Sequence, residues 1–262
     1  MSQALIDYSG LRQRIENYQN SYLASSFRHC LIDRLCDPEA LALASREIPG
    51  PEDEAWHRYD SPLEKKRSLR CHEPGFAPGF APGFQALLYE LNSDAFVALM
   101  GEISGIEGLI ADSSLLCTEL HCSEPQSFLG IHTDATVHPR DFQLLKRLTA
   151  VLYLSPDWRE CQGGDLELWN PDVSERLAAI APRFNRLVLF ESAECSYHGH
   201  PHPLQAPPGF LRYSLTASYF TRAASPHEHP RKALFHPRPH ERGDGLDGLR
   251  RDRSNIAPIP YI

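Results

Sequence analysis

The stretch Phe128-Leu-Gly-Ile-His-Thr-Asp134 decides how this chain is interpreted. If it forms a β-strand, residues two apart point to the same side, so His132 and Asp134 leave the backbone in parallel. An imidazole and a carboxylate placed in this way can share one metal ion. A chain with 13 histidines contains such a pair by chance fairly often, so the pair alone is a weak signal.

A third candidate ligand follows a second apolar segment. The run Arg186-Leu-Val-Leu-Phe190 predicts a buried strand, and His198 lies just beyond the polar residues that follow it. Two imidazoles and one carboxylate occupy one face of an octahedral metal, which is the arrangement of non-haem Fe(II) oxygenases. The tract from His198 to His202 is also compatible with a surface loop that binds no metal.

An arginine follows the third candidate ligand on another apolar run. Arg212 precedes Ser214 by two residues, and its planar guanidinium is suited to binding a carboxylate with two hydrogen bonds. The ordered set of His-x-Asp, a later histidine and Arg-x-Ser is much less expected by chance than any one of its parts.

Several longer segments share features with one known family. They are Arg147–Trp158, Gly163–Trp169, Ala181–Phe190, Ser196–Leu204 and Leu211–Phe220. Together with the candidate ligands they resemble the Fe(II)/2-oxoglutarate-dependent oxygenase superfamily, in its prolyl 4-hydroxylase-like branch. The resemblance covers roughly residues 115–221. Upstream, residues 28–39 are similar to the entry segment of related bacterial hydroxylases.

The resemblance implies a fold and a set of roles. The fold is mainly β with flanking helices, around a double-stranded β-helix (jelly-roll) core. His132, Asp134 and His198 would bind Fe(II) as the catalytic centre, and Arg212 with Ser214 would bind the distal carboxylate of 2-oxoglutarate. O₂ is the second co-substrate, and ascorbate is an optional reductant. His198 is preferred to His200 because it takes the family's position after an aromatic residue.

The expected activity is that of a 2-oxoglutarate-dependent Fe(II) dioxygenase. It would hydroxylate an unactivated C–H bond of a small molecule, with succinate and CO₂ as co-products. A prolyl or other protein side-chain hydroxylase is the alternative. A non-catalytic jelly-roll binding module is a third class, disfavoured because such a module needs no open iron site. Asp134 occupies the position that a halide would need, so halogenation is not expected.

Composition limits the partners. The net charge of -8 argues against a nucleic-acid-binding surface. The tail from residue 222 to 262 has 8 basic and 5 acidic residues, so a basic rim favouring an anionic substrate and a solvated tail are both open. Seven cysteines without a Cys-x-x-Cys pair, no leader and no long apolar run predict a cytoplasmic protein without a membrane partner.

The 262 residues are expected to form a single oxygenase domain. Residues 1–114 are predicted to be mostly helical and to pack on the core, residues 115–221 to form the jelly roll, and residues 222–262 to be an irregular basic tail. The Pro-Gly-Phe repeat at Pro74–Phe84 predicts a turn-rich connector in preference to a mobile lid. Either the repeat or the tail is expected to border the mouth of the barrel. His121 is expected to be a core histidine or to face the same cavity as the ligands.

Overall fold

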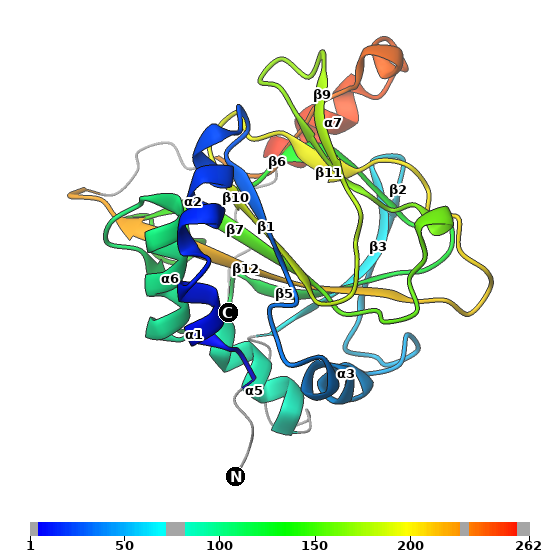
Figure 1. The fold of residues 1–262 in the computed structure, drawn as a ribbon. Helices are drawn as coiled ribbons and strands as arrows, with labels where there is room; N and C mark the ends of the chain where they lie inside the picture. The colour runs from blue at the N-terminus through cyan, green and yellow to red at the C-terminus, as the bar shows by residue number, and fades with distance from the viewer. Residues whose placement is uncertain (1–4, 72–81, 226–230, 256–262) are drawn as a thin grey trace.

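One curled antiparallel sheet forms the body of the protein (Figure 1). The computed structural model describes residues 5–71, 82–225 and 231–255 of the chain. The strands are β1 (His29–Asp33), β2 (His57–Ser61), β3 (Glu64–Arg70), β4 (Ile110–Ala111), β5 (Thr118–Ser123), β6 (Phe128–Thr133), β7 (Leu144–Tyr153), β8 (Leu166–Trp169), β9 (Arg176–Ile180), β10 (Arg186–Glu191), β11 (His198–His200), β12 (Arg212–Arg222) and β13 (Leu234–Phe235).

The strand order shows how the sheet closes on itself. Neighbouring strands run β1-β10-β7-β12-β5-β3-β6-β11-β8-β9, and β2, β4 and β13 pair at its side with β3, β12 and β6. The strands β5, β7 and β12 line one wall of a central cavity, while β6, β8 and β11 contribute to the other. Two facing walls of antiparallel strands are the architecture of the predicted jelly roll.

The long strand β12 separates the cavity from the main hydrophobic core. Leu215, Ala217 and Tyr219 are fully buried in that core, whereas the alternate residues Ser214 and Ser218 line the cavity. This alternation follows from the two-residue period of a strand. The strand therefore presents an apolar face to the helices and a polar face to the cavity.

Helices cover the outer face of the wall made by β7 and β12 (Figure 1). They are α1 (Tyr8–Arg12), α2 (Ile15–Ala24), α3 (Pro38–Arg46), α5 (Pro82–Leu91) and α6 (Asp94–Ser104). The last helix, α7 (Asp247–Asn255), lies elsewhere and contacts β13, and two 3₁₀ turns form at Glu160–Gln162 and Pro239–Glu241. Asp37 and Ser93 cap α3 and α6, because their side chains accept hydrogen bonds from backbone N–H groups of the first turn. Within the described residues, no helix is both long and apolar enough to span a membrane.

The first 114 residues contain more strand than expected. Helices are their main elements, but β1 adds an edge strand beside β10, and β3 lies between β5 and β6 inside the sheet. Four consecutive charged residues, Glu64 to Arg67, begin β3, and Leu69 is the one large apolar side chain that the strand buries. A strand so rich in charge gives a weak hydrophobic signal, because its polar side faces the cavity.

The two segments expected near the mouth have different outcomes. Residues 74–81 of the Pro-Gly-Phe repeat lie outside the described residues, and its last unit, Pro82–Phe84, begins α5. The basic tail returns to the barrel, where β13 pairs with β6 and residues 231–233 and Phe235 line the cavity. The tail therefore borders the cavity, as the sequence predicts, with short regular elements in place of a wholly irregular chain.

Candidate active site

Three side chains from two neighbouring strands meet at one point of the cavity wall. His132 is the second-to-last residue of β6, and Asp134 lies one residue beyond the end of that strand. His198 is the first residue of β11 and pairs directly with His132. One ligand atom from each lies within 4.8 Å of the others. Asp134 Oδ1 is 3.7 Å from Nε2 of both imidazoles. The geometry is that of a compact three-ligand metal site.

Backbone carbonyls orient both imidazoles. His132 Nδ1 lies 2.9 Å from the carbonyl oxygen of Gly130, and His198 Nδ1 lies 2.9 Å from that of Ser196. A carbonyl only accepts, so each Nδ1 carries the proton and donates. Each Nε2 then keeps a free lone pair directed at Asp134, which is the usual arrangement of a metal-binding histidine.

The protonation states suit a cation. Burial lowers the pKa of His132 to about 3, with the neighbouring His198 adding to the effect, and burial also lowers the pKa of His198. Burial alone would raise the pKa of Asp134, but Lys146 and the two imidazoles hold it well below its usual range. At neutral pH the set is therefore two neutral imidazoles and one carboxylate.

Arg212 is a buried cation that has no acidic partner among the described residues. Its side chain is 3% exposed, and it donates to the Gly164 carbonyl at 2.5 Å and to Ser123 Oγ at 3.0 Å. Its Nη2 also lies 3.1 Å from His200 Nε2, while its Nε has no hydrogen-bond partner in the described part of the chain. A buried guanidinium that lacks a carboxylate is costly unless a ligand supplies one.

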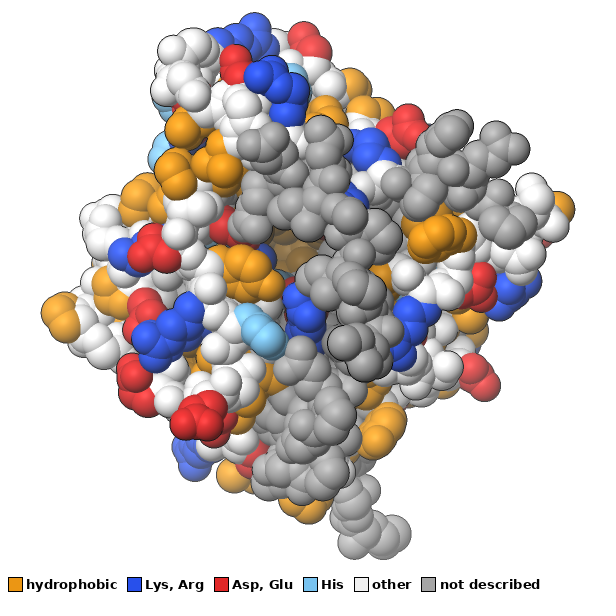
Figure 2. Space-filling model, turned by 180° about the vertical axis from the view of Figure 1, so that it is seen from behind, with side chains coloured by type: hydrophobic (Ala, Val, Ile, Leu, Met, Phe, Trp, Pro, Cys, Tyr) orange, Lys and Arg blue, Asp and Glu red, His pale blue; other side chains and the backbone are white. Residues whose placement is uncertain are grey.

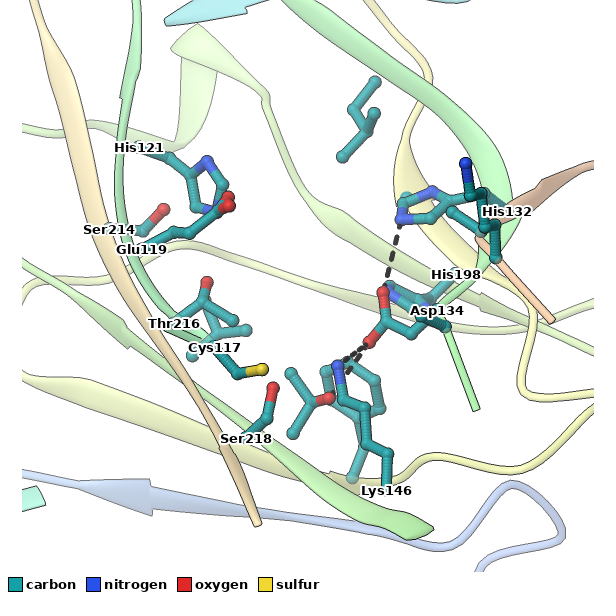
Figure 3. Close-up of a pocket in the computed structure, with 18 of the residues that line it drawn as sticks. Cys117, Glu119, His121, His132, Asp134, Lys146, His198, Ser214, Thr216 and Ser218 are labelled. Carbon is teal, nitrogen blue, oxygen red and sulfur yellow. Dashed lines mark hydrogen bonds and ion pairs between the residues drawn. The ribbon is translucent and has the colours of Figure 1, made fainter. Parts of the chain in front are cut away.

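His132, Asp134 and His198, called the triad from here on, share one cavity of about 590 Å³ with Arg212. Figure 3 shows the polar side chains of β5 and β12 facing the triad across it. Ser214 lies beside Tyr153 on the neighbouring strand, and both line the cavity with Arg212. On the molecular face in Figure 2, acidic and basic side chains are interspersed among hydrophobic ones.

Comparison with known protein families supports the predicted resemblance. Residues 118–220 match the model of the 2OG-Fe(II) oxygenase superfamily, and this range contains His132, Asp134, His198 and Arg212. This part of the chain is therefore similar to the 2OG-Fe(II) oxygenase superfamily. The family uses Fe(II), 2-oxoglutarate and O₂, so the predicted resemblance and cofactors are confirmed.

One curated relative is similar over part of its length. The chain is 30% identical over 96 residues to prolyl 3-hydroxylase OGFOD1 of Xenopus laevis. The match covers 35% of this chain and 18% of that protein, so the chain spans less than a fifth of this relative.

Solved structures of other oxygenases share the fold. A prolyl 4-hydroxylase from Phytophthora capsici has a TM-score of 0.60 at 19% identity, covering 97% of this chain and 77% of that one. A Pseudomonas putida prolyl-4-hydroxylase has a TM-score of 0.57 at 17% identity, covering 80% and 100%. A Trichoplax adhaerens prolyl hydroxylase, solved with a hypoxia inducible factor peptide, has a TM-score of 0.56 at 18% identity, covering 81% and 93%. The predicted jelly-roll fold is confirmed.

The residues present fit the cofactors of an oxygenase. The two free Nε2 atoms and the carboxylate are a donor set suited to Fe(II). Arg212, whose Nε has no partner among the described residues, is the residue that would hold a carboxylate of 2-oxoglutarate. His200 points its Nε2 at Arg212 and lies outside the group of converging ligand atoms, so it is placed to orient the arginine.

Some residues at the site are not evident from the sequence. Tyr153 and Lys146 come from β7, where a polar residue within an apolar run is the one visible signal. His121 of β5 lines the cavity and pairs directly with Ser214 of β12. Its Nδ1 has no hydrogen-bond partner in the described part of the chain. Its place in the cavity agrees with the second of the two alternatives left open for it.

A second group with metal-ligating side chains lies near the cavity. His138 Nε2 is 3.4 Å from Asp112 Oδ1, and Cys117 lies close to both. The backbone N–H of Arg140 donates to His138 Nδ1 at 3.2 Å, so the proton of this imidazole is on Nε2. Asp112 also accepts from the backbone of Ser114 and Cys117, at 3.0 and 2.6 Å. These contacts fasten a loop, and the protonated Nε2 does not suit a metal.

Proposed function

We propose that the chain is an Fe(II)- and 2-oxoglutarate-dependent dioxygenase that hydroxylates an unactivated C–H bond. The observation that carries this proposal is the convergence of His132, Asp134 and His198 in the cavity that also holds the unpaired guanidinium of Arg212. The whole chain would act as one oxygenase domain. Its seven cysteines are free thiols, which supports a reducing, cytoplasmic location.

Each residue has a part that follows from its contacts. His132 and His198 would hold Fe(II) through Nε2, with their Nδ1 protons fixed by carbonyl acceptors. Asp134 would supply one carboxylate oxygen. Arg212, with Ser214 and Tyr153 beside it, would hold the distal carboxylate of 2-oxoglutarate and so set the direction in which this molecule lies. Bound Fe(II) would supply the oxidative chemistry in which O₂ and 2-oxoglutarate are consumed, the C–H bond is hydroxylated, and succinate and CO₂ are formed.

A small molecule is our first proposal for the main substrate. A cavity of about 590 Å³ lies within the range that encloses a small ligand. A prolyl or other protein side chain is the second candidate, because the relatives named above are prolyl hydroxylases and one of them is solved with a peptide. The two candidates differ in whether a proline-containing peptide or only small molecules accelerate succinate formation.

The test of the proposed function is a metal and turnover measurement. The full chain should bind one Mn(II) or Fe(II) per molecule and release succinate in an O₂-dependent reaction with 2-oxoglutarate. The substitution Asp134→Ala should abolish both, while the substitution Asp157→Ala, at an exposed position outside the cavity, should leave both unchanged. Metal binding or turnover that survives Asp134→Ala would overturn the assignment.

A further inference from the structure

A polar wall of the cavity extends beyond the end that Arg212 occupies. Alternate residues of β12, namely Ser214, Thr216 and Ser218, line the cavity beside Glu119 and His121 of β5 (Figure 3). Four residues along a strand cover about 13 Å. Ser218 therefore lies much farther along the wall than Ser214.

The far end of this wall lies at the triad. Ser218 pairs across the sheet with Thr149, and Thr149 Oγ1 donates to Asp134 Oδ2 at 3.0 Å. Ser218 is at the opposite end of the wall from Arg212, so it is not placed to bind the carboxylate that Arg212 would hold. This end is left for the molecule that is oxidised.

The wall ends in polar groups that lack protein partners. Ser218 is 3% exposed, and its hydroxyl has no hydrogen-bond partner in the described part of the chain. The same is true of the Thr216 hydroxyl, which also faces the cavity. Both residues line the cavity, so their hydroxyls can form hydrogen bonds with a ligand bound there.

Glu119 adds a negative charge to this wall. Among the described residues, the one charged or chargeable group within 4 Å of its carboxylate is His121, with Nε2 3.7 Å from Oε2. Burial lowers the pKa of His121 well below its ordinary value, so that imidazole is neutral. Two of the lysines that line the cavity have carboxylates of their own, since Lys66 lies 3.8 Å from Glu64 and Lys146 lies 2.6 Å from Asp134, and Lys232 is the third lysine of the lining.

We propose that Glu119, Thr216 and Ser218 form the site for the main substrate and select a protonated amine. The carboxylate supplies the countercharge and the two hydroxyls accept or donate the remaining hydrogen bonds. This inference rests on the proposed function, because it takes the triad and Arg212 as already occupied. It narrows the substrate to an amine-bearing molecule.

The experiment compares two probes that differ in one group. The full chain is loaded with Mn(II) and 2-oxoglutarate, and proton relaxation is measured for 4-aminobutan-1-ol and for butane-1,4-diol. Bound Mn(II) relaxes only a probe that binds close to the metal. The amine should be relaxed about five- to ten-fold more than the diol, as expected for a partly solvated charge-assisted hydrogen bond.

Matched variants give the control. Glu119→Gln should reduce relaxation of the amine to that of the diol, and Ser218→Ala should reduce it for both probes. Glu107→Gln, at an exposed position that does not line this cavity, should change neither. Equal relaxation of the two probes in the unmodified chain, relaxation of neither, or an unchanged preference in Glu119→Gln would overturn the proposal.

Failure of the proposed function is separately visible. Mn(II) binding is first measured by electron paramagnetic resonance, with and without 2-oxoglutarate. If Mn(II) does not bind, the oxygenase assignment fails. The amine and the diol are then compared by calorimetry on the metal-free chain, where loss of the preference in Glu119→Gln still supports the amine site and its absence still refutes it.

Discussion

Lys146 Nζ lies 2.6 Å from Oδ2 of Asp134, the oxygen that faces away from the two imidazoles. Thr149 Oγ1 donates to the same oxygen at 3.0 Å. The other oxygen, Oδ1, is the one at 3.7 Å from both histidines. Two donors on one oxygen leave the carboxylate a single oxygen for a metal, so the remaining coordination positions stay open to co-substrates.

Replacement of Lys146 by Met should lower turnover more than metal affinity. Loss of the ammonium leaves the Asp134 carboxylate less well oriented, which lowers metal affinity, but it also removes a positive charge that repels a divalent ion, and these effects on affinity oppose each other. We expect 2-oxoglutarate turnover to fall about 10- to 100-fold, as for other groups that orient metal ligands. Succinate formation and Mn(II) titration measure the two quantities. A larger loss in affinity than in turnover would contradict this role.

Replacement of Arg212 by Met should separate co-substrate binding from folding. The guanidinium has no acidic partner among the described residues, so its removal does not strand a buried carboxylate. The Kd for 2-oxoglutarate should rise at least about 30-fold, the lower end for loss of one partner of a buried charge pair. Arg212→Lys should also weaken binding, because a point charge replaces a planar fork. Calorimetry on the Mn(II)-loaded chain measures this, and unchanged affinity in both variants would refute the role.

Gly199, between the two histidines of β11, is needed for the strands to approach. A Cβ there would lie 2.7 Å from the Gly130 carbonyl oxygen and 2.8 Å from that of Leu129. The Gly130 carbonyl is also the acceptor for His132 Nδ1. Gly199→Ala should therefore destabilise the fold by about 2 kcal/mol or more and weaken Mn(II) binding as well. Gly209→Ala, in a loop with open space around it but at positive φ, is the comparison: it should destabilise the fold and leave Mn(II) binding intact.

The jelly roll could be predicted from the sequence. The same holds for the candidate roles of His132, Asp134, His198 and Arg212, because each of these residues lies on or beside an apolar segment that predicts a strand. Polar and apolar residues alternate along β12 from Ser214 to Tyr219, and such patterns are local. The contact of Lys146 with Asp134 is different, because it depends on how the loop between β6 and β7 returns. No pattern in the residues between them encodes that path.

The orientation of His200 shows a second limit of the sequence. His198 and His200 are two residues apart, and both are compatible with a metal ligand in a histidine-rich tract. The register of β11 shifts between them, so His198 lies opposite His132 while His200 lies opposite Leu129. That irregularity turns His200 toward Arg212. A register shift depends on the partner strand, which a single segment does not reveal.

Stability of the metal-free chain should depend on pH through His121. Its pKa in the folded chain is well below 6.5, because of burial and then the positive charge of Lys66. At a pH between the pKa of His121 in the folded chain and its ordinary value of 6.5, this residue binds more protons in the unfolded chain than in the folded one. The stabilisation that comes from burying the neutral imidazole is therefore fully present above pH 6.5 and is lost as the pH falls below it. The free energy of unfolding of His121→Gln should fall less steeply with decreasing pH than that of the unmodified chain. The two slopes should differ by up to about 1.4 kcal/mol per pH unit. Urea unfolding between pH 5 and pH 7 measures this, and parallel curves for the two proteins would contradict it.

Phe235 joins the C-terminal segment to the metal-binding strand. It pairs with His132 across β13 and β6, its ring centroid lies 5.4 Å from that of His132, and it is 8% exposed. Phe235→Ala should cost about 3 kcal/mol in unfolding free energy, since a buried aromatic ring is lost. The imidazole of His132 would lose its packing on one side, so Mn(II) affinity should fall as well.

Phe235→Leu is the matched variant, because it keeps an apolar side chain of similar reach at the same position. We expect it to retain most of the stability and most of the Mn(II) affinity, since the backbone pairing of β13 with β6 does not depend on the ring. If Phe235→Ala lowers stability without changing Mn(II) affinity, the segment only fastens the fold. If both fall together in Ala and recover together in Leu, packing on His132 is what couples the C-terminal segment to the site.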